Sequence, residues 1–113
     1  MLGAAGLLDG LTATTHWARY ADLAACGAIP ASGRVVEHLD RRIITAAGVS
    51  AGIDMALRLT ELLADRTAAQ AAQLLIEYDP QPPFDCGARP KATDEVMDRV
   101  REYDTPRPVS GQR

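Results

Sequence analysis

Two β-branched runs followed by a long helical run constrain the fold of this chain more than any other stretch. Residues 34–39 and 42–46 are the β-branched runs, and the two residues between them predict a pair of strands joined by a tight turn. After Gly48, residues 51–64 follow a helical pattern, with Ser50 as the expected N-cap. A strand that passes through a glycine into a helix is typical of α/β proteins.

The helix expected at residues 51–64 carries its polar residues in one narrow stripe. Asp54, Arg58, Glu61 and Asp65 are spaced so that they share one side, whereas nearly all other positions are apolar. We therefore expect this helix to be buried on most sides. Within the stripe, the spacing of Asp54 and Arg58 predicts an exposed i,i+4 ion pair rather than a catalytic acid.

The beginning of the chain predicts a short strand between two helices. Residues 2–8 read as the end of a helix, with Gly10 in the usual place for a left-handed cap. Residues 11–15 are rich in threonine and predict the strand, and residues 19–26 predict the second helix, with Gly27 as its stop.

The other segments are predicted from their prolines, caps and composition. We expect one domain over residues 1–104, because 113 residues lie near the middle of the usual size range for a single domain. In chain order we expect a loop at 29–33, a helix from a capping box at 67–70 to near Tyr78, an extended proline arm at 79–84, a helix opened by Thr93, and a disordered tail at 105–113.

The end of the first strand holds the strongest candidates for chemistry. His16 follows the strand, where open α/β sheets bind ligands, so it could exchange a proton near neutral pH or only hydrogen-bond a neighbouring loop. Trp17 could form the wall of an apolar pocket or pack on the next helix. The hydroxyls of Thr14 and Thr15 could reach the same cleft, although β-propensity also explains them. Gly48 could expose backbone amides to a negative charge or allow close packing.

Three stretches of the sequence resemble the ThiJ/PfpI family of the class I glutamine-amidotransferase-like superfamily. They are Gly3–Trp17, Ala46–Asp54 and Ile76–Asp85. The resemblance implies the C-terminal half of a flavodoxin-like doubly wound α/β sandwich, in which His16 faces the reactive cysteine of the family. That cysteine would fall ahead of Met1, so the resemblance implies a truncated domain that is inactive alone.

The proline-rich third stretch resembles the isonitrile hydratase branch of this family. The resemblance implies that a cysteine thiolate attacks the terminal carbon of an isonitrile, that an acidic residue of the other half handles protons, and that water releases an N-substituted formamide. It also implies His16 as the catalytic residue of this chain and Thr15, Trp17 and Gly48 as substrate-binding residues. The alternative is a non-catalytic ligand-sensing or dimerisation module, such as the similar domain of AraC-type regulators.

Charge and cysteine content limit the partners and the location of the protein. A net charge of −3 and a pI of about 5.2 argue against nucleic acid or an anionic membrane. The sequence has neither a signal-peptide pattern nor a long apolar run, which predicts a cytoplasmic protein. Cys26 and Cys86 match no metal-ligand or redox spacing, so we expect no metal, no cofactor and no nucleophile from them. A small-molecule substrate and a homo-oligomer, associated through residues 51–64 or the proline arm, are expected.

Overall fold

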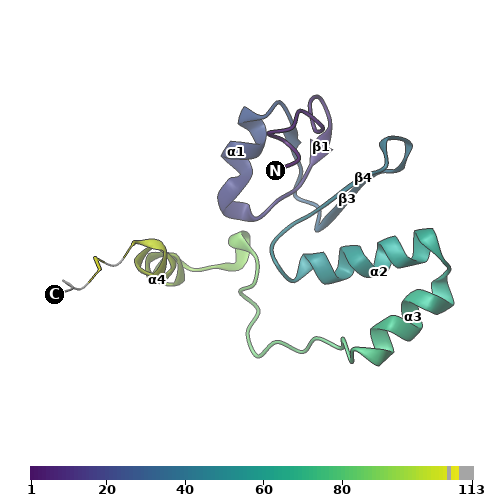
Figure 1. Ribbon diagram of the computed structural model, residues 1–113. Helices are drawn as coiled ribbons and strands as arrows, with labels where there is room; N and C mark the ends of the chain where they lie inside the picture. Colours follow the sequence, from purple (N-terminus) through teal and green to yellow (C-terminus); the bar gives the residue numbers. More distant parts are fainter. Residues whose placement is uncertain (107, 110–113) are drawn as a thin grey trace. The chain divides into compact units, whose positions relative to one another are not determined.

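The computed structural model describes residues 1–106, 108 and 109, and the chain divides into two compact units. The first unit, Met1–Pro80, contains both sheets and the first three α-helices (Figure 1). The second begins at Gln81 and contains η3 (Arg89–Lys91) and α4 (Asp94–Asp104). The single domain expected over residues 1–104 stays a prediction. The tail expected at 105–113 lies partly outside the described residues, at 107 and 110–113.

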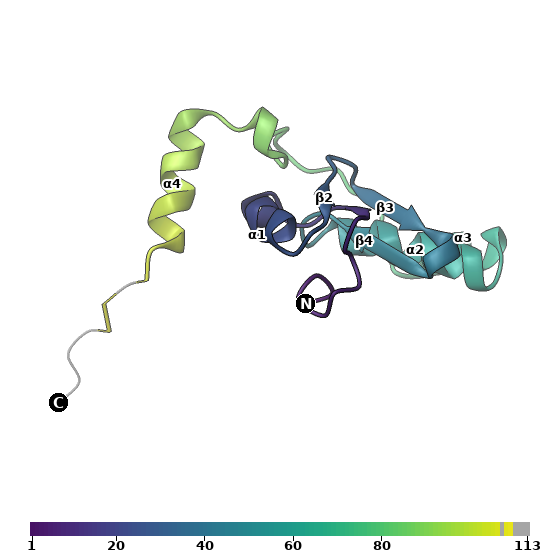
Figure 2. The same ribbon diagram turned by 90° about the horizontal axis from the view of Figure 1, so that it is seen from above.

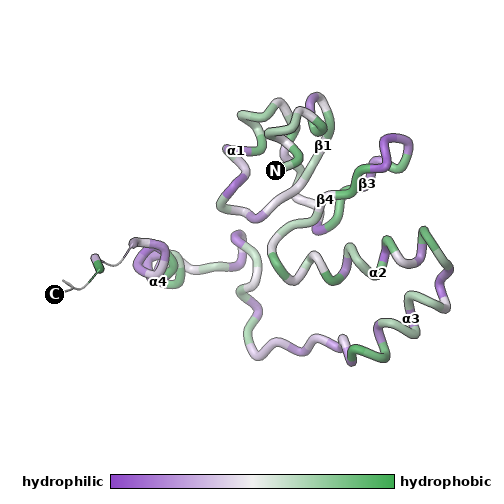
Figure 3. The backbone as a smooth tube through the Cα atoms, viewed as in Figure 1, coloured by the Kyte–Doolittle hydropathy of each residue, from purple (hydrophilic) through white to green (hydrophobic). Residues whose placement is uncertain are grey.

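The first unit contains two small sheets of opposite type. β1 (Thr12–Ala13) pairs in parallel with β2 (Ile29–Pro30). β3 (Val35–His38) and β4 (Ile43–Ala46) form an antiparallel hairpin, as the sequence predicted. Figure 3 shows the apolar strands of this hairpin leading into a hydrophilic turn. The fold is therefore a mixture of helices and short strands of the α/β kind.

The predicted loop at 29–33 is wrong at its beginning, because Ile29 and Pro30 form a strand. The Ile29 amide donates to the Leu11 carbonyl and the Ala31 amide donates to the Ala13 carbonyl, each over 2.8 Å. Pro30 has no N–H, but residues 29 and 31 make the bonds in this register, so the proline interrupts nothing. A minimal β–α–β unit results, with α1 (Tyr20–Ala25) as its crossover.

Gly27 shapes the return from α1 to β2. It follows the helix in a left-handed conformation with φ +83°, and a methyl group at its Cα would collide with the carboxylate of Asp9. The predicted helix stop at Gly27 is therefore confirmed. The helix predicted at 2–8 is wrong, because residues 2–10 form turns with left-handed glycines at Gly6 and Gly10.

Helices α2 (Ala51–Leu63) and α3 (Arg66–Leu75) pack side by side after the hairpin (Figure 2). The long helix predicted at 51–64 is confirmed. The capping box predicted at Thr67 is wrong, because Asp65 is the N-cap of α3 and accepts the Ala68 amide over 2.7 Å. Thr93 caps α4 as expected, accepting the Val96 amide over 3.3 Å.

The hydrophobic core of the first unit is small and lies around β1. It consists of Leu8, Ala13, Leu23 and Ala28, with Ile43 packed against them. Within α2 only Ala51 is buried, so the expectation that this helix is buried on most sides is wrong for the chain as described. Among the described residues no helix is long and apolar enough to cross a membrane.

Candidate functional site

His16 lies where β1 leads into the first helical turn. It is the N-cap of η1 (Trp17–Arg19), and its Nδ1 accepts a hydrogen bond from the Ala18 amide over 3.2 Å. An imidazole nitrogen that accepts an N–H carries no proton, so the neutral ring carries its proton on Nε2. The side chain is exposed, which leaves Nε2 open to an incoming group.

Trp17 is half-buried beside this histidine. The centres of the two rings are 5.1 Å apart, and their planes are tilted by 36°. This separation lies within the range at which neighbouring aromatic rings attract each other. The indole therefore restricts the positions that the imidazole can take.

Gly48 lies against the edge of the imidazole at Cδ2. A methyl group on its Cα would lie 3.3 Å from Cδ2 of His16, which is tight for two carbon atoms. The β4–α2 turn therefore contacts the β1–η1 junction through a glycine that leaves room for the ring. The structure thus brings together three of the predicted site residues, His16, Trp17 and Gly48.

Replacing Gly48 by alanine is expected to displace the His16 ring without unfolding the chain. The backbone of Gly48 does not have a positive φ, so alanine fits there and the strain falls on the exposed imidazole. The ring signals of His16 in an NMR spectrum should shift, whereas those of His38 should stay in place. Gly52→Ala is the matched control, because a methyl group there meets no atom within 4 Å. Unchanged His16 signals would contradict the contact.

We call His16, Trp17 and Gly48 the corner. Two threonines next to it connect the end of β1 with β4. The amide of buried Thr14 donates to Oγ1 of buried Thr45 over 3.0 Å. The hydroxyl of Thr14 is itself buried and has no hydrogen-bond partner among the described residues. Thr15 is half-buried and follows Thr14 toward His16.

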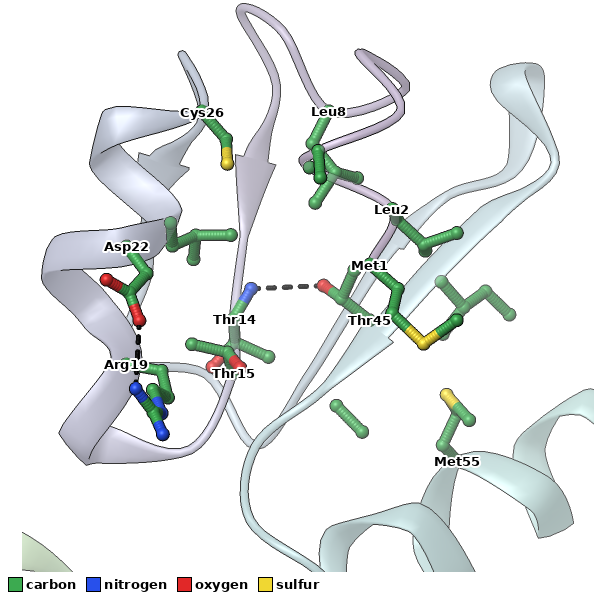
Figure 4. Close-up of a pocket in the computed structure, with 15 residues that line it drawn as sticks. Met1, Leu2, Leu8, Thr14, Thr15, Arg19, Asp22, Cys26, Thr45 and Met55 are labelled. Atoms are coloured by element: carbon green, nitrogen blue, oxygen red, sulfur yellow. Dashed lines mark hydrogen bonds and ion pairs between the residues drawn. The ribbon is translucent and has the colours of Figure 1, made fainter.

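A pocket of about 680 Å³ opens beside the two threonines (Figure 4). Its volume is in the range of small-molecule sites. Of the predicted substrate-binding residues, Thr15 lines it, whereas Trp17 and Gly48 do not. Five parts of the first unit form its walls. They are the N-terminal turns (Met1, Leu2, Gly3, Ala4, Leu8), the residues after β1 (Thr14, Thr15), the face of η1 and α1 with its C-cap (Arg19, Asp22, Leu23, Cys26), β4 (Ile44, Thr45, Ala46) and α2 (Met55).

The sequence did not predict the pocket face of α1, although its spacing contained the signal. Arg19, Asp22, Leu23 and Cys26 follow the i, i+3, i+4, i+7 pattern of one helix face. Arg19 and Asp22 are paired over 3.3 Å and largely exposed. The half-buried thiol of Cys26 lies near the backbone of Gly3.

A polar cluster around Arg34 also holds the β4–α2 turn. Arg34 pairs with Asp54 through Nε, and its Nη2 donates to the Ser50 hydroxyl over 3.1 Å. The Tyr78 hydroxyl donates to the other oxygen of Asp54 over 2.7 Å. We call Arg34, Asp54 and Tyr78 the clasp.

The hydrogen bonds of the clasp change the acidity of its members. Those from Tyr78 and then from Arg34 hold the pKa of Asp54 below its usual value. The bond to Asp54 raises the pKa of Tyr78. The contribution of Asp54 to stability is therefore present above its unfolded pKa and is lost as the pH falls through the folded value. The contribution of Tyr78 is lost only as the pH rises through its raised pKa.

The predicted Asp54–Arg58 pair is wrong. Arg58 instead donates to Glu37 over 2.6 Å and to Glu61 over 2.9 Å, whereas Asp54 belongs to the clasp. The two carboxylates raise the pKa of Arg58. Both cysteines are free, and the described residues contain no group of three potential metal ligands.

No family model matches the chain. The chain is 47% identical over 106 residues to an isonitrile hydratase from Pseudomonas putida, covering 94% of this chain and 46% of that protein. It matches the crystal structure of a ThiJ/PfpI family protein from Pseudomonas syringae with a TM-score of 0.81 and 48% identity, covering 90% of this chain and 41% of the other.

The chain thus spans about half the length of the relatives it matches. Sequence and fold agree over that half, and the matched lengths are consistent with the C-terminal half of a flavodoxin-like domain. Over this half the chain is homologous to an isonitrile hydratase and to a ThiJ/PfpI family protein.

Proposed function

We propose that this chain forms part of an isonitrile hydratase site, which adds water to an isonitrile and gives an N-substituted formamide. The observation that carries the proposal is the 47% identity to an isonitrile hydratase over 94% of the chain. The corner formed by His16, Trp17 and Gly48 supports it, because it supplies an accessible imidazole with restricted orientation. His16 is the catalytic residue of the proposal, and Thr15, Trp17 and Gly48 contact the substrate.

His16 acts in this proposal through Nε2. Nδ1 accepts the Ala18 amide, so Nε2 carries the ring proton and can donate a hydrogen bond that orients an incoming thiolate. An exposed ring is suited to a group that approaches from another part of the protein. The contacts with Trp17 and Gly48 would keep the ring directed toward that group.

The nucleophilic thiolate of the proposal comes from a polypeptide segment other than those described. Cys26 caps the C-terminal end of α1, where the negative end of the helix dipole disfavours a thiolate. Cys86 is exposed in the second unit and lies ahead of Ala88, the N-cap of the short η3. Neither cysteine has the surroundings that activate a thiol.

The chemistry of the proposal balances without a cofactor or a metal. The thiolate forms a bond to the terminal carbon of the isonitrile, and a proton is delivered to that carbon to give a thioimidate. Water then adds to the same carbon and the carbon–sulfur bond breaks. The N-substituted formamide leaves and the thiol is regenerated, so the net change is the addition of one water.

The proposal also covers the oligomeric state, the ligand and the location of the protein. We propose a homo-oligomer, because large apolar side chains of α2 and α3 are exposed. A small molecule is the ligand. Both cysteines are free, which agrees with the reducing conditions of the cytoplasm.

The test is the formation of N-cyclohexylformamide from cyclohexyl isocyanide, and chromatography measures the product. The chain alone should give no product. A mixture with the half of the Pseudomonas putida isonitrile hydratase that this chain does not match should turn over, since that half would supply the thiolate. Cys26→Ser and Cys86→Ser should keep the activity of the mixture.

Two results would contradict the proposal. Turnover by the chain alone that disappears in Cys26→Ser or Cys86→Ser would place the nucleophile within this chain. A stable mixture that binds the isonitrile without turnover would favour the ligand-sensing alternative.

A further inference from the structure

Arg34 holds the β4–α2 turn at two points that enclose Gly48. Its carbonyl accepts the Ala47 amide over 2.9 Å, immediately before the glycine. Its guanidinium donates to Ser50 over 3.1 Å, two residues after it, and also pairs with Asp54 in the first turn of α2. The short segment between these anchors therefore has little freedom to move away from His16.

Tyr78 extends the same arrangement to a third element. It follows α3, and its hydroxyl donates to the Asp54 oxygen that Arg34 does not use. Gln73 of α3 donates in turn to the Tyr78 carbonyl over 3.1 Å, which fixes the segment that carries the ring. The clasp thus connects the start of β3, the N-terminal turn of α2 and the segment after α3.

The clasp is better suited to fix a position than to stabilise the fold. The side chains of Arg34 and Asp54 are 52% and 33% exposed. Exposed ion pairs contribute about 0–1 kcal/mol, because water screens them and two side chains must be ordered. A planar guanidinium that engages two partners nevertheless specifies a geometry that a single point contact cannot.

The geometry points to Arg34 as a positioning residue for His16, acting through the turn that places Gly48 against the imidazole. The inference rests on the proposed function for the role of His16. The structural part rests on the contacts alone. Arg34 bonds to Ala47 and Ser50, and Gly48 lies between them. Gly48 is so close to His16 that a methyl group added to its Cα would lie 3.3 Å from Cδ2 of the ring. Asp54 accepts from Arg34 and from the Tyr78 hydroxyl, and so holds the guanidinium in place.

Arg58 on α2 offers a matched control. Like Arg34 it pairs with carboxylates, Glu37 on β3 and Glu61 on α2, and its side chain is 37% exposed. Among the described residues, none of its hydrogen-bond partners lies in the turn. A general loss of charge pairing would therefore act equally through Arg58, whereas positioning of His16 would not.

The experiment is histidine NMR on the full 113-residue chain. The variants are Arg34→Lys, Tyr78→Phe and the control Arg58→Gln. Lysine keeps the charge but cannot bridge Asp54 and Ser50 in the manner of a guanidinium. We expect the His16 ring signals to move in Arg34→Lys, and to move less in the same direction in Tyr78→Phe.

His38 provides the internal reference, because its Nε2 bonds to Thr12 and lies outside the clasp. Its signals should stay in place in Arg34→Lys and Tyr78→Phe. The amides of Ala51 and Ile53, which bond to the Gly48 and Ser50 carbonyls, should exchange with solvent about tenfold faster in Arg34→Lys. Arg58→Gln should leave the His16 signals unchanged.

Unchanged His16 signals in a folded Arg34→Lys chain would overturn the inference, and so would an equal response in Arg58→Gln. If Arg34→Lys does not fold, the milder Tyr78→Phe decides by the same criterion. The formamide assay with the complementary half separates the two claims. Arg34→Lys should lower kcat with little change in KM, whereas shifted His16 signals without any turnover would leave the positioning intact and contradict only the proposed function.

Discussion

Replacing His16 by alanine is expected to lower kcat of the assembled two-part enzyme by about 10²–10⁴-fold, the usual contribution of a group that transfers or orients a proton. Nε2 carries the proton of the neutral ring and has no partner among the described residues, so it is available to the incoming thiol. The measurement is the rate of formamide formation at saturating isonitrile by the mixture of the two halves. Binding of the halves to each other should not change.

Alanine also removes the N-cap of η1, so a second variant must separate chemistry from folding. Loss of an N-cap side chain costs about 0.5–2 kcal/mol of stability. Asparagine is a good N-cap, hence His16→Asn should keep the bond from the Ala18 amide while removing the imidazole. Both variants should lose activity equally, but only alanine should lower the unfolding midpoint. If His16→Asn keeps more than half of the rate, His16 is only a helix cap.

The elements that the sequence predicted well are those determined by local pattern. The hairpin of β3 and β4 follows from two β-branched runs, and α2 follows from its helical spacing and the glycine before it. Ile29–Pro30 shows the limit of such patterns. Proline indicates a loop when read alone, and only the pairing with β1 reveals that its missing N–H is not needed.

The site shows the same division between local and distant interactions. The family resemblance placed His16 and Gly48 in one site, and the structure brings them into contact although β1 and β4 belong to different sheets. The clasp could not be anticipated, since Asp54 lies 20 residues from Arg34 and 24 residues from Tyr78. The i,i+4 rule assigned Asp54 to Arg58, but such a pair is worth only about 0.3–0.5 kcal/mol and loses to two stronger partners.

The chain by itself is expected to associate in solution, as a dimer or a larger species, through the exposed leucines of α2 and α3. Leu63 is 79% exposed, and Leu74 and Leu75 are 81% and 88% exposed. Figure 3 shows the end of α3 as a hydrophobic stretch. Each leucine gains about 1.5–3 kcal/mol when it is fully buried, so a few of them across an interface favour association strongly. Light scattering at micromolar concentration measures the mass.

The sequence left open whether residues 51–64 or the proline arm forms the contact, and two variants decide between them. Leu59→Ser with Leu63→Ser on α2, at side chains that are 40% and 79% exposed, should lower the mass, because hydroxyl groups at these positions remove apolar area that drives association. Phe84→Ser on the arm should leave the mass unchanged, although Phe84 is also 74% exposed. The reverse result would assign the interface to the arm. A sharp monomer peak from the unchanged chain, together with cooperative unfolding, would mean that the small core around Leu8 and Leu23 is sufficient for the chain to fold alone.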